Sequence, residues 1–105
     1  MKYLETIVCQ TEKGKEARLE RMIRSRIELS KRQDGCSAAW YGISNTDPYL
    51  FIIQIVYQSL DEFHDVKKVV ESTLDAKDGG LEACLVGPPL LGLFDIGDDA
   101  LNSAE

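Results

Sequence analysis

The sequence predicts an α+β fold in which one four-stranded sheet carries two helices on a single face. Four apolar segments have the length and composition of strands, and two longer segments have the apolar spacing of amphipathic helices. The strand predicted over residues 49–57 is apolar on both faces. With 105 residues, 44% of them hydrophobic and 29% charged, the chain is long enough for one domain with a single core.

The first two elements are a strand over residues 2–10 and a helix over residues 13–32. Apolar residues alternate along the strand, with Tyr3, Ile7 and Cys9 on one face and Leu4, Thr6 and Val8 on the other. In the helix, charged residues separate apolar ones that recur mostly three or four positions apart: Leu19, Met22, Ile23, Ile27 and Leu29. Gly35 follows this pattern, and we expect it to end the helix in a left-handed conformation.

Residues 36–44 and 49–57 predict two strands joined as a hairpin by the turn Asn45-Thr46-Asp47-Pro48. If this turn pairs Ser44 with Tyr49, Trp40 shares a face with Tyr57 and Tyr41 shares a face with Gln54. A shift of one residue exchanges the two faces, because side chains alternate along a strand.

The second helix begins after Ser59, which can cap it, while Glu62 can reach back to the cap. Its apolar stripe consists of Phe63, Val66, Val69, Val70 and Leu74. Asp78-Gly79-Gly80 ends this helix, and residues 81–86 fit either a short helical turn or an extended run. Gly87-Pro88-Pro89 lies outside any central strand because proline lacks a backbone donor. Residues 90–96 predict the fourth strand.

This order of elements, βαββαβ, is the ferredoxin-like arrangement with an antiparallel four-stranded sheet. Right-handed crossovers place the third strand between the first and second, and the fourth strand outside the first. Both helices then cover one face. Each aliphatic side chain left in water on the other face would forgo about 1.5–3 kcal/mol of stabilisation. We therefore expect a face-to-face or edge-sharing homodimer that covers this face. We assign residues 1–97 to a single domain and residues 98–105 to a polar C-terminal tail.

Charge and cysteine content narrow the function classes. The net charge is −6, and although residues 11–32 carry +4, that stretch interleaves acids with bases, so we expect no nucleic-acid partner. No run approaches the ~18 apolar residues of a membrane span, and the N-terminal segment does not read as a signal peptide. The odd number of cysteines, Cys9, Cys36 and Cys84, fits reduced thiols and a cytoplasmic protein without a metal site.

Three short motifs carry a resemblance to a known family. They are Lys13-Gly14-Lys15-Glu16 before the first helix, Asp34-Gly35-Cys36 before the second strand, and Val56-Tyr57-Gln58-Ser59 followed by Phe63. In their order and spacing over residues 2–96, the chain resembles the antibiotic biosynthesis monooxygenase-like family of dimeric α/β-barrel proteins. The resemblance implies a cavity on the face of the sheet away from the helices. It also implies oxygenation of an aromatic or polyketide-like small molecule without a cofactor.

The same resemblance implies where functional side chains would lie. Family members commonly have an aromatic residue at the end of the third strand and a histidine nine residues later, positions that Tyr57 and Val66 occupy here. Members that degrade haem typically need an asparagine where this chain has Ile7, so haem degradation is disfavoured. His64 lies two residues before Val66, about 200° away around the helix axis.

Five residues are candidates for the substrate pocket, and none is assigned to the catalytic step. Tyr57, Trp40, Tyr41 and Gln54 could donate hydrogen bonds to developing negative charge, and His64 could act as a base. Packing in the core or dimer interface is the alternative for Tyr57 and Trp40, an intersubunit hydrogen bond for Gln54, and a solvated surface for His64.

The resemblance favours the Tyr57 face as the cavity lining, whereas polarity favours the Gln54 face, because a core covered by helices tolerates an unpaired amide poorly. Two functions therefore stay open: a cofactor-independent monooxygenase, and a dimer of the same fold that binds a ligand or partner without catalysis.

Overall fold

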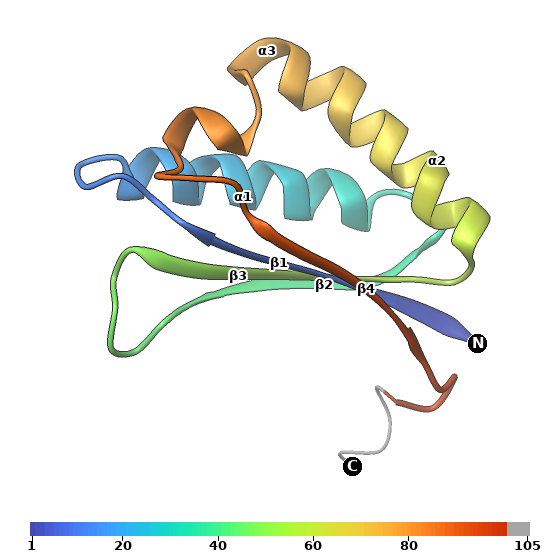
Figure 1. Cartoon of the computed structure of the whole chain (residues 1–105). Coiled ribbons are helices and arrows are strands. Elements are labelled where there is room, and N and C mark those ends of the chain that lie inside the picture. Colours follow the sequence, from blue (N-terminus) through green and yellow to red (C-terminus); the bar gives the residue numbers. More distant parts are fainter. Residues whose placement is uncertain (101–105) are drawn as a thin grey trace.

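The computed structural model describes residues 1–100 and confirms the predicted topology. The strands are β1 (Lys2–Gln10), β2 (Cys36–Ile43), β3 (Leu50–Tyr57) and β4 (Leu90–Ile96), and the helices are α1 (Glu16–Lys31), α2 (Leu60–Val70) and α3 (Ala76–Asp78). The sheet order is β2-β3-β1-β4, and each pair of neighbours is antiparallel. Both long helices lie over the same face of this sheet (Figure 1).

The two faces of the sheet differ in how they are covered. Beneath the helices, alternate residues of β3 are at most 6% exposed: Phe51, Ile53, Ile55 and Tyr57. They form one core cluster with the apolar stripe of α1, in which Leu19 and Ile23 are fully buried. On the opposite face, which we call the open face, Trp40, Ile52 and Phe94 are 38%, 36% and 53% exposed. The predicted apolar face without helices is therefore present.

The hairpin has a register one residue away from the expected one. Ser44 N donates to Leu50 O at 2.9 Å, so Ser44 pairs with Leu50 rather than Tyr49. The cause is a loop longer by one residue, in which Asp47 Oδ1 accepts from Tyr49 N at 2.9 Å. This Asx turn holds Tyr49 outside the ladder. As a result Trp40 pairs with Gln54 and shares its face, while Tyr41 lies on the face of Tyr57.

Gly35 has a different role from the predicted one. The glycines with positive φ among the described residues are Gly14, Gly79 and Gly80, so Gly35 does not end α1 in a left-handed conformation. It is buried instead where the loop before β2 meets α2, and a Cβ atom there would lie 2.6 Å from the Cβ atom of Glu62. Gly35 thus permits a close approach between two elements.

The second helix begins as predicted and continues through a π-helical turn. Ser59 Oγ accepts from Glu62 N at 3.2 Å, the expected cap. The π turn, η1 (Glu71–Asp75), joins α2 to α3, and the whole helix ends before Gly79, whose φ is 79°. Residues 81–84 form the 3₁₀ turn η2 (Leu81–Cys84), which resolves the ambiguous segment.

Several further expectations can be compared with the described residues. Cys9, Cys36 and Cys84 are free, and Cys9 and Cys36 lie at opposite ends of β3. Burial raises the pKa of the Cys9 thiol to about 11, which keeps it protonated and unreactive near neutral pH. Within residues 1–100, no helix combines the length and hydropathy required to cross a membrane. Residues 101–105 of the predicted tail lie outside the described part of the chain.

Candidate functional site

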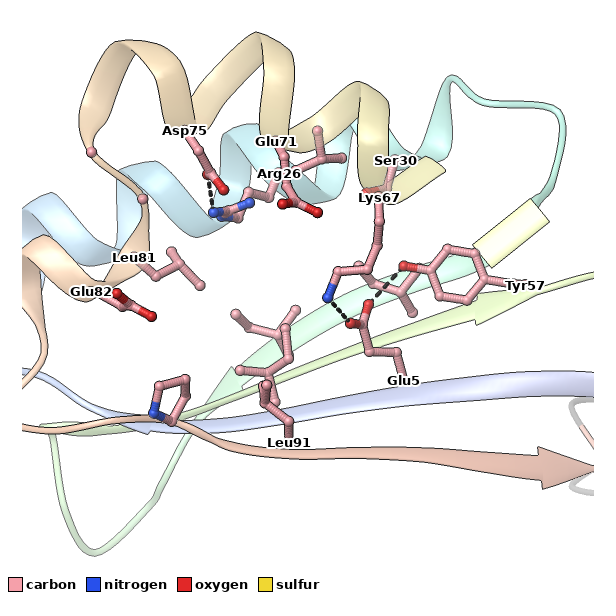
Figure 2. A pocket seen from close by; sticks show the side chains of 17 residues that line it. Glu5, Arg26, Ser30, Tyr57, Lys67, Glu71, Asp75, Leu81, Glu82 and Leu91 are labelled. Atoms are coloured by element: carbon pink, nitrogen blue, oxygen red, sulfur yellow. Dashed lines mark hydrogen bonds and ion pairs between the residues drawn. The ribbon is translucent and has the colours of Figure 1, made fainter. Parts of the chain in front are cut away.

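A cavity of about 300 Å³ lies between the helices and the sheet. Its floor consists of aliphatic side chains from β1, β3 and β4, and its roof consists of polar side chains from α1, α2 and η1 (Figure 2). The resemblance implied a cavity on the face of the sheet away from the helices, whereas this cavity lies on the face that the helices cover. That is the Tyr57 face of β3, since Ile53, Ile55 and Tyr57 all belong to the cavity wall. A volume near 300 Å³ is at the small end of ligand pockets.

A buried carboxylate connects two other polar groups at one end of this cavity. Glu5 is 6% exposed and lies on the helix-covered face of β1, where it pairs with Ile55 of β3. Tyr57 Oη donates to Glu5 Oε1 at 2.7 Å, and Lys67 Nζ donates to Glu5 Oε2 at 2.8 Å. Figure 2 shows the three side chains converging from β1, β3 and α2. A charge in such an apolar wall is tolerated because it is both paired and hydrogen-bonded.

The environment of Tyr57 keeps its hydroxyl protonated. Burial, and then the negative charge of Glu5, raise the pKa of Tyr57 far above its usual value near 10. The ring of Phe63 meets the Tyr57 ring edge-on at 5.1 Å between centroids, and Lys67 Nζ lies 5.5 Å from the centroid of Phe63. Phe63 thus packs against both partners of Glu5 and restricts their movement. Tyr57 can act here as a hydrogen-bond donor and not as a tyrosinate.

A second charged pair lies in the roof of the cavity. An amino group of Arg26, on α1, donates to Asp75 Oδ1 of η1, and this arginine side chain is only 14% exposed. Ser30, one turn further along α1, is 1% exposed and also lines the cavity. Glu71 and Glu82 are exposed cavity residues and lie at its rim.

The π turn brings the polar groups of the second helix onto one side. In an α-helix, residues four apart drift by about 40° around the axis, so Lys67, Glu71 and Asp75 would spiral away from one another. The wider π turn over Glu71–Asp75 winds less per residue and reverses this drift. All three residues consequently line the cavity.

Of the five predicted pocket residues, Tyr57 alone lines this cavity. Trp40 and Gln54 lie together on the open face, where Trp40 Nε1 donates to Gln54 Oε1 at 2.8 Å. Gln54 Nε2 donates in turn to Thr6 Oγ1 at 3.3 Å. Trp40, Gln54 and Thr6 thus form a polar chain across three strands in the middle of an apolar surface.

Tyr41 and His64 are also separate from the cavity. Tyr41 Oη donates to Glu20 Oε2 at 2.6 Å and accepts from Arg24 Nε at 2.8 Å, so its hydroxyl is engaged at the surface of α1. This hydrogen bond from Tyr41, with the charge of Arg24, lowers the pKa of Glu20. His64 is exposed on α2, and its ring packs against Phe63. Val66, at the position of the family histidine, is 3% exposed in the core.

Sequence reasoning missed the charged cavity residues Glu5, Lys67, Arg26 and Asp75. Glu5 carried a usable signal, because it is the one acidic residue on the strand face that Tyr3, Ile7 and Cys9 otherwise make apolar. Lys67 and Arg26 carried none, since each looks like an ordinary polar position of an amphipathic helix. Within residues 1–100, no group of three or more histidine, cysteine or acidic side chains could hold a metal ion.

Comparison with known proteins supports the fold assignment. The sequence matches no protein-family model and no curated protein. Among solved structures, the chain is similar to the "Putative antibiotic biosynthesis monooxygenase from Nitrosomonas europaea", with a TM-score of 0.80 and 16% identity over 90% of this chain and 89% of that one.

Two further structures have the same architecture. A variant of SnoaB, a cofactor-independent oxygenase from Streptomyces nogalater, has a TM-score of 0.77 and 15% identity over 90% of this chain and 92% of that one. A conserved protein from Methanosarcina mazei Go1 has a TM-score of 0.82 and 11% identity over 92% and 94%. The resemblance to the monooxygenase-like proteins is confirmed at the level of the fold.

Proposed function

We propose that this protein is a cofactor-independent monooxygenase that oxidises an aromatic or polyketide-like small molecule in the cavity beneath the helices. The observation that carries this proposal is the Glu5 carboxylate beside the Lys67 ammonium, 2.8 Å apart, at one end of a cavity that has an aliphatic floor. A base next to a fixed cation suits the formation of a carbanion whose charge spreads onto an oxygen. The shared fold with SnoaB is consistent with this chemistry.

The reaction needs no metal or flavin because the substrate supplies the electrons. A ring methylene next to a carbonyl-bearing aromatic system loses one proton and becomes an enolate-type carbanion. The carbanion reduces dioxygen and combines with it, and one proton then completes a hydroperoxide. Loss of water breaks the O–O bond and removes the remaining methylene hydrogen. One oxygen atom is thus retained as a new carbonyl, and the other leaves as water.

Each cavity group has a role in this sequence. Glu5 takes the methylene proton, because each of its oxygens keeps a lone pair beyond the bonds to Tyr57 and Lys67. Lys67 stabilises the developing enolate oxygen with its remaining ammonium protons. Tyr57 stays protonated and holds Glu5 in place. The aliphatic floor of Ile7, Ile53 and Ile55 excludes water from the carbanion.

Oxygen uptake tests this function. Chelator-treated protein supplied with anthrone is expected to consume one dioxygen for each anthraquinone formed, faster than the spontaneous reaction in buffer. Glu5→Gln and Lys67→Met should each lower kcat by about 10²–10³-fold. Lys68→Met, at the exposed neighbour of Lys67, is the matched control and should leave the rate unchanged.

Circular dichroism and urea unfolding establish that each variant is folded before its rate is compared. A rate equal to that in buffer, or a rate that folded Glu5→Gln and Lys67→Met both retain, would refute the proposal.

Ligand binding without turnover is the second candidate. It is favoured by the engagement of both Glu5 oxygens in hydrogen bonds, which restrains the carboxylate and leaves it fewer free lone pairs to accept a substrate proton. The oxygen-uptake assay distinguishes the two functions. A binding protein would protect anthrone in its cavity and slow its oxidation, whereas an oxygenase would accelerate it.

We further propose that the protein acts as a cytoplasmic homodimer in which the open faces of two copies pack together. Trp40, Ile52 and Phe94 supply exposed apolar surface on this face, and Leu90 is 74% exposed beside them. The polar chain from Trp40 through Gln54 to Thr6 gives the oxygen and the nitrogen of the central amide one partner each within one copy, which lowers the cost of burying this amide in an interface. The cavity under the helices remains free for a ligand in each copy.

A further inference from the structure

The ion pair between Arg26 and Asp75 joins α1 to the π turn across the roof of the cavity (Figure 2). The two side chains are 14% and 32% exposed, so solvent screens their charges less than those of a fully exposed pair. The Asp75 carboxyl also lies against the turn after α3, because a Cβ atom at Gly80 would be 3.7 Å from Asp75 Cγ. Asp75 is therefore a point at which α1, the π turn and this later turn meet.

The contact with Arg26 depends on the π turn. In an unbroken α-helix, Asp75 would lie about 80° around the axis from Lys67, which precedes it by eight residues. The π turn winds less per residue and brings Asp75 back to the side of Lys67, so both residues line the cavity. Turns of this kind are rare and are frequent at functional sites. The consequence of this one is that Asp75 reaches Arg26.

Two local costs coincide at this ion pair. One is the π turn, which interrupts the regular winding of the helix. The other is Arg26 Nε, which is buried and has no hydrogen-bond partner among residues 1–100. A buried ion pair is itself weak evidence for stability, because desolvation offsets much of its attraction. Local costs that stability does not explain are typical of functional sites, so we ask what this pair positions.

Lys67 is the residue that most needs a fixed position. Its side chain is long and 36% exposed, and such a lysine gains little from an ion pair alone because ordering a flexible chain costs entropy. The Lys67 ammonium nevertheless meets Glu5 at 2.8 Å. On the N-terminal side of Lys67, Phe63 packs edge-on against an aromatic ring of β3. On the C-terminal side, Asp75 ties the same helix to α1 through Arg26.

We propose that Asp75 and Arg26 are positioning residues that hold the Lys67 ammonium at Glu5. Their bond fixes the helix about two turns beyond Lys67, so α2 neither rotates about its axis nor slides along it without breaking that bond. This role rests on the proposed oxygenase function, in which Lys67 stabilises the enolate oxygen. A displacement of about 1 Å at such a group can lower a rate about 10²-fold.

Hydrogen exchange of the Lys67 ammonium tests the positioning without turnover. Ammonium protons held in a hydrogen bond exchange slowly with water and are detected by side-chain ¹⁵N NMR. The main variant is Arg26→Met/Asp75→Ala, which removes the bond and leaves no buried charge without a partner. Asp75→Asn keeps an oxygen acceptor for Arg26. Glu28→Gln is the matched control, because Glu28 pairs with Arg32 at the exposed surface of α1.

We expect the double variant to accelerate exchange of the Lys67 ammonium at least about fivefold and to lower kcat for anthrone oxidation about tenfold, with KM changed less than about twofold. Asp75→Asn should stay within about twofold of the unmodified protein in both measurements. Glu28→Gln should match the unmodified protein. Loss of a merely structural contact would lower the Tm without changing Lys67 exchange.

Arg26→Met alone is the second route if the double variant does not fold, because the Asp75 left behind is 32% exposed and water can solvate it. It should accelerate Lys67 exchange as the double variant does.

Two results would overturn the positioning role. One is a folded double variant, or a folded Arg26→Met, in which the Lys67 ammonium exchanges as slowly as in the unmodified protein. The other is an Asp75→Asn variant that loses as much as the double variant, since the effect would then come from the charge and not from the bond. Failure of the oxygenase function has a different signature, namely faster Lys67 exchange in the double variant together with no anthrone-dependent oxygen uptake by any of the proteins.

Discussion

Glu5 is a buried carboxylate in the wall of the cavity. It is an acidic residue on the core face of a strand, and both of its oxygens are engaged by side chains from other elements, Tyr57 and Lys67. The sequence shows that Glu5 is unusual for its strand, because it is an acidic residue on an otherwise apolar face. Its partners could not be predicted, because Lys67 is 62 residues away and its contact depends on how α2 lies across the sheet.

Tyr57→Phe tests the electrostatic state of this group. The substitution removes a hydrogen bond to a charged acceptor, so we expect a loss of about 1.5–3 kcal/mol in the free energy of unfolding near pH 7. The pKa of Tyr57 is higher in the folded protein than in the unfolded chain. The stability that the protonated hydroxyl gives the folded protein is therefore complete below the unfolded pKa of about 10 and is lost as the pH rises above it.

Urea unfolding of both proteins between about pH 7 and pH 11 measures this difference. The stability difference between the unmodified protein and Tyr57→Phe should be constant up to about pH 9 and should shrink above it. The raised pKa of Cys9 affects both proteins alike and cancels in the comparison. A difference that grows with pH would contradict the assigned state of Tyr57.

At the scale of elements, the sequence predicted the strands and helices better than it predicted the hairpin register and the π turn. Segment periodicity was sufficient for β1 and β4, whose bounds agree with the prediction. The hairpin register differed by one residue because Asp47 forms a local hydrogen bond that periodicity does not encode. That single shift moved Trp40 and Tyr41 to the faces opposite those expected. The π turn was equally invisible, because its sequence is compatible with a plain helix.

The contact between Gly35 and α2 provides a test at this scale. An alanine Cβ atom at position 35 would lie 2.2 Å from Glu62 Oε2 and 2.6 Å from Glu62 Cβ, so removing only the carboxylate would not relieve the clash. We expect Gly35→Ala to cost about 1–3 kcal/mol of stability. Glu62→Gly alone should cost about 1 kcal/mol through helix propensity.

The double variant separates crowding from other causes. With the Glu62 side chain absent, Gly35→Ala should cost at least about 1 kcal/mol less than it does in the unmodified protein. Urea unfolding of the four proteins gives the coupling. If the loss of stability in the double variant equals the sum of the two single losses within about 0.5 kcal/mol, Gly35 is required for a reason other than this contact.

At the scale of the whole molecule, the two faces of one sheet differ in character. The face beneath the helices holds the cavity with Glu5 and Lys67, and the open face exposes Trp40, Ile52 and Phe94, the surface that we propose packs against a second copy. The sequence predicted that one face would lack a cover, because two helices cannot cover both. It could not show that the cavity lies on the covered side, since an internal space depends on how helices and sheet pack in three dimensions.

The location of a bound ring compound tests this division most directly. The measurement is a crystal structure of the protein grown with anthraquinone, the product of the proposed reaction. We expect the ligand beneath the helices, over Ile7 and Ile53, with one oxygen toward Lys67 and with the open faces of two copies packed together. A ligand bound between the sheets of two packed copies would contradict the assignment of chemistry to the helix-covered side. An empty cavity together with an open face left in solvent would contradict it as well.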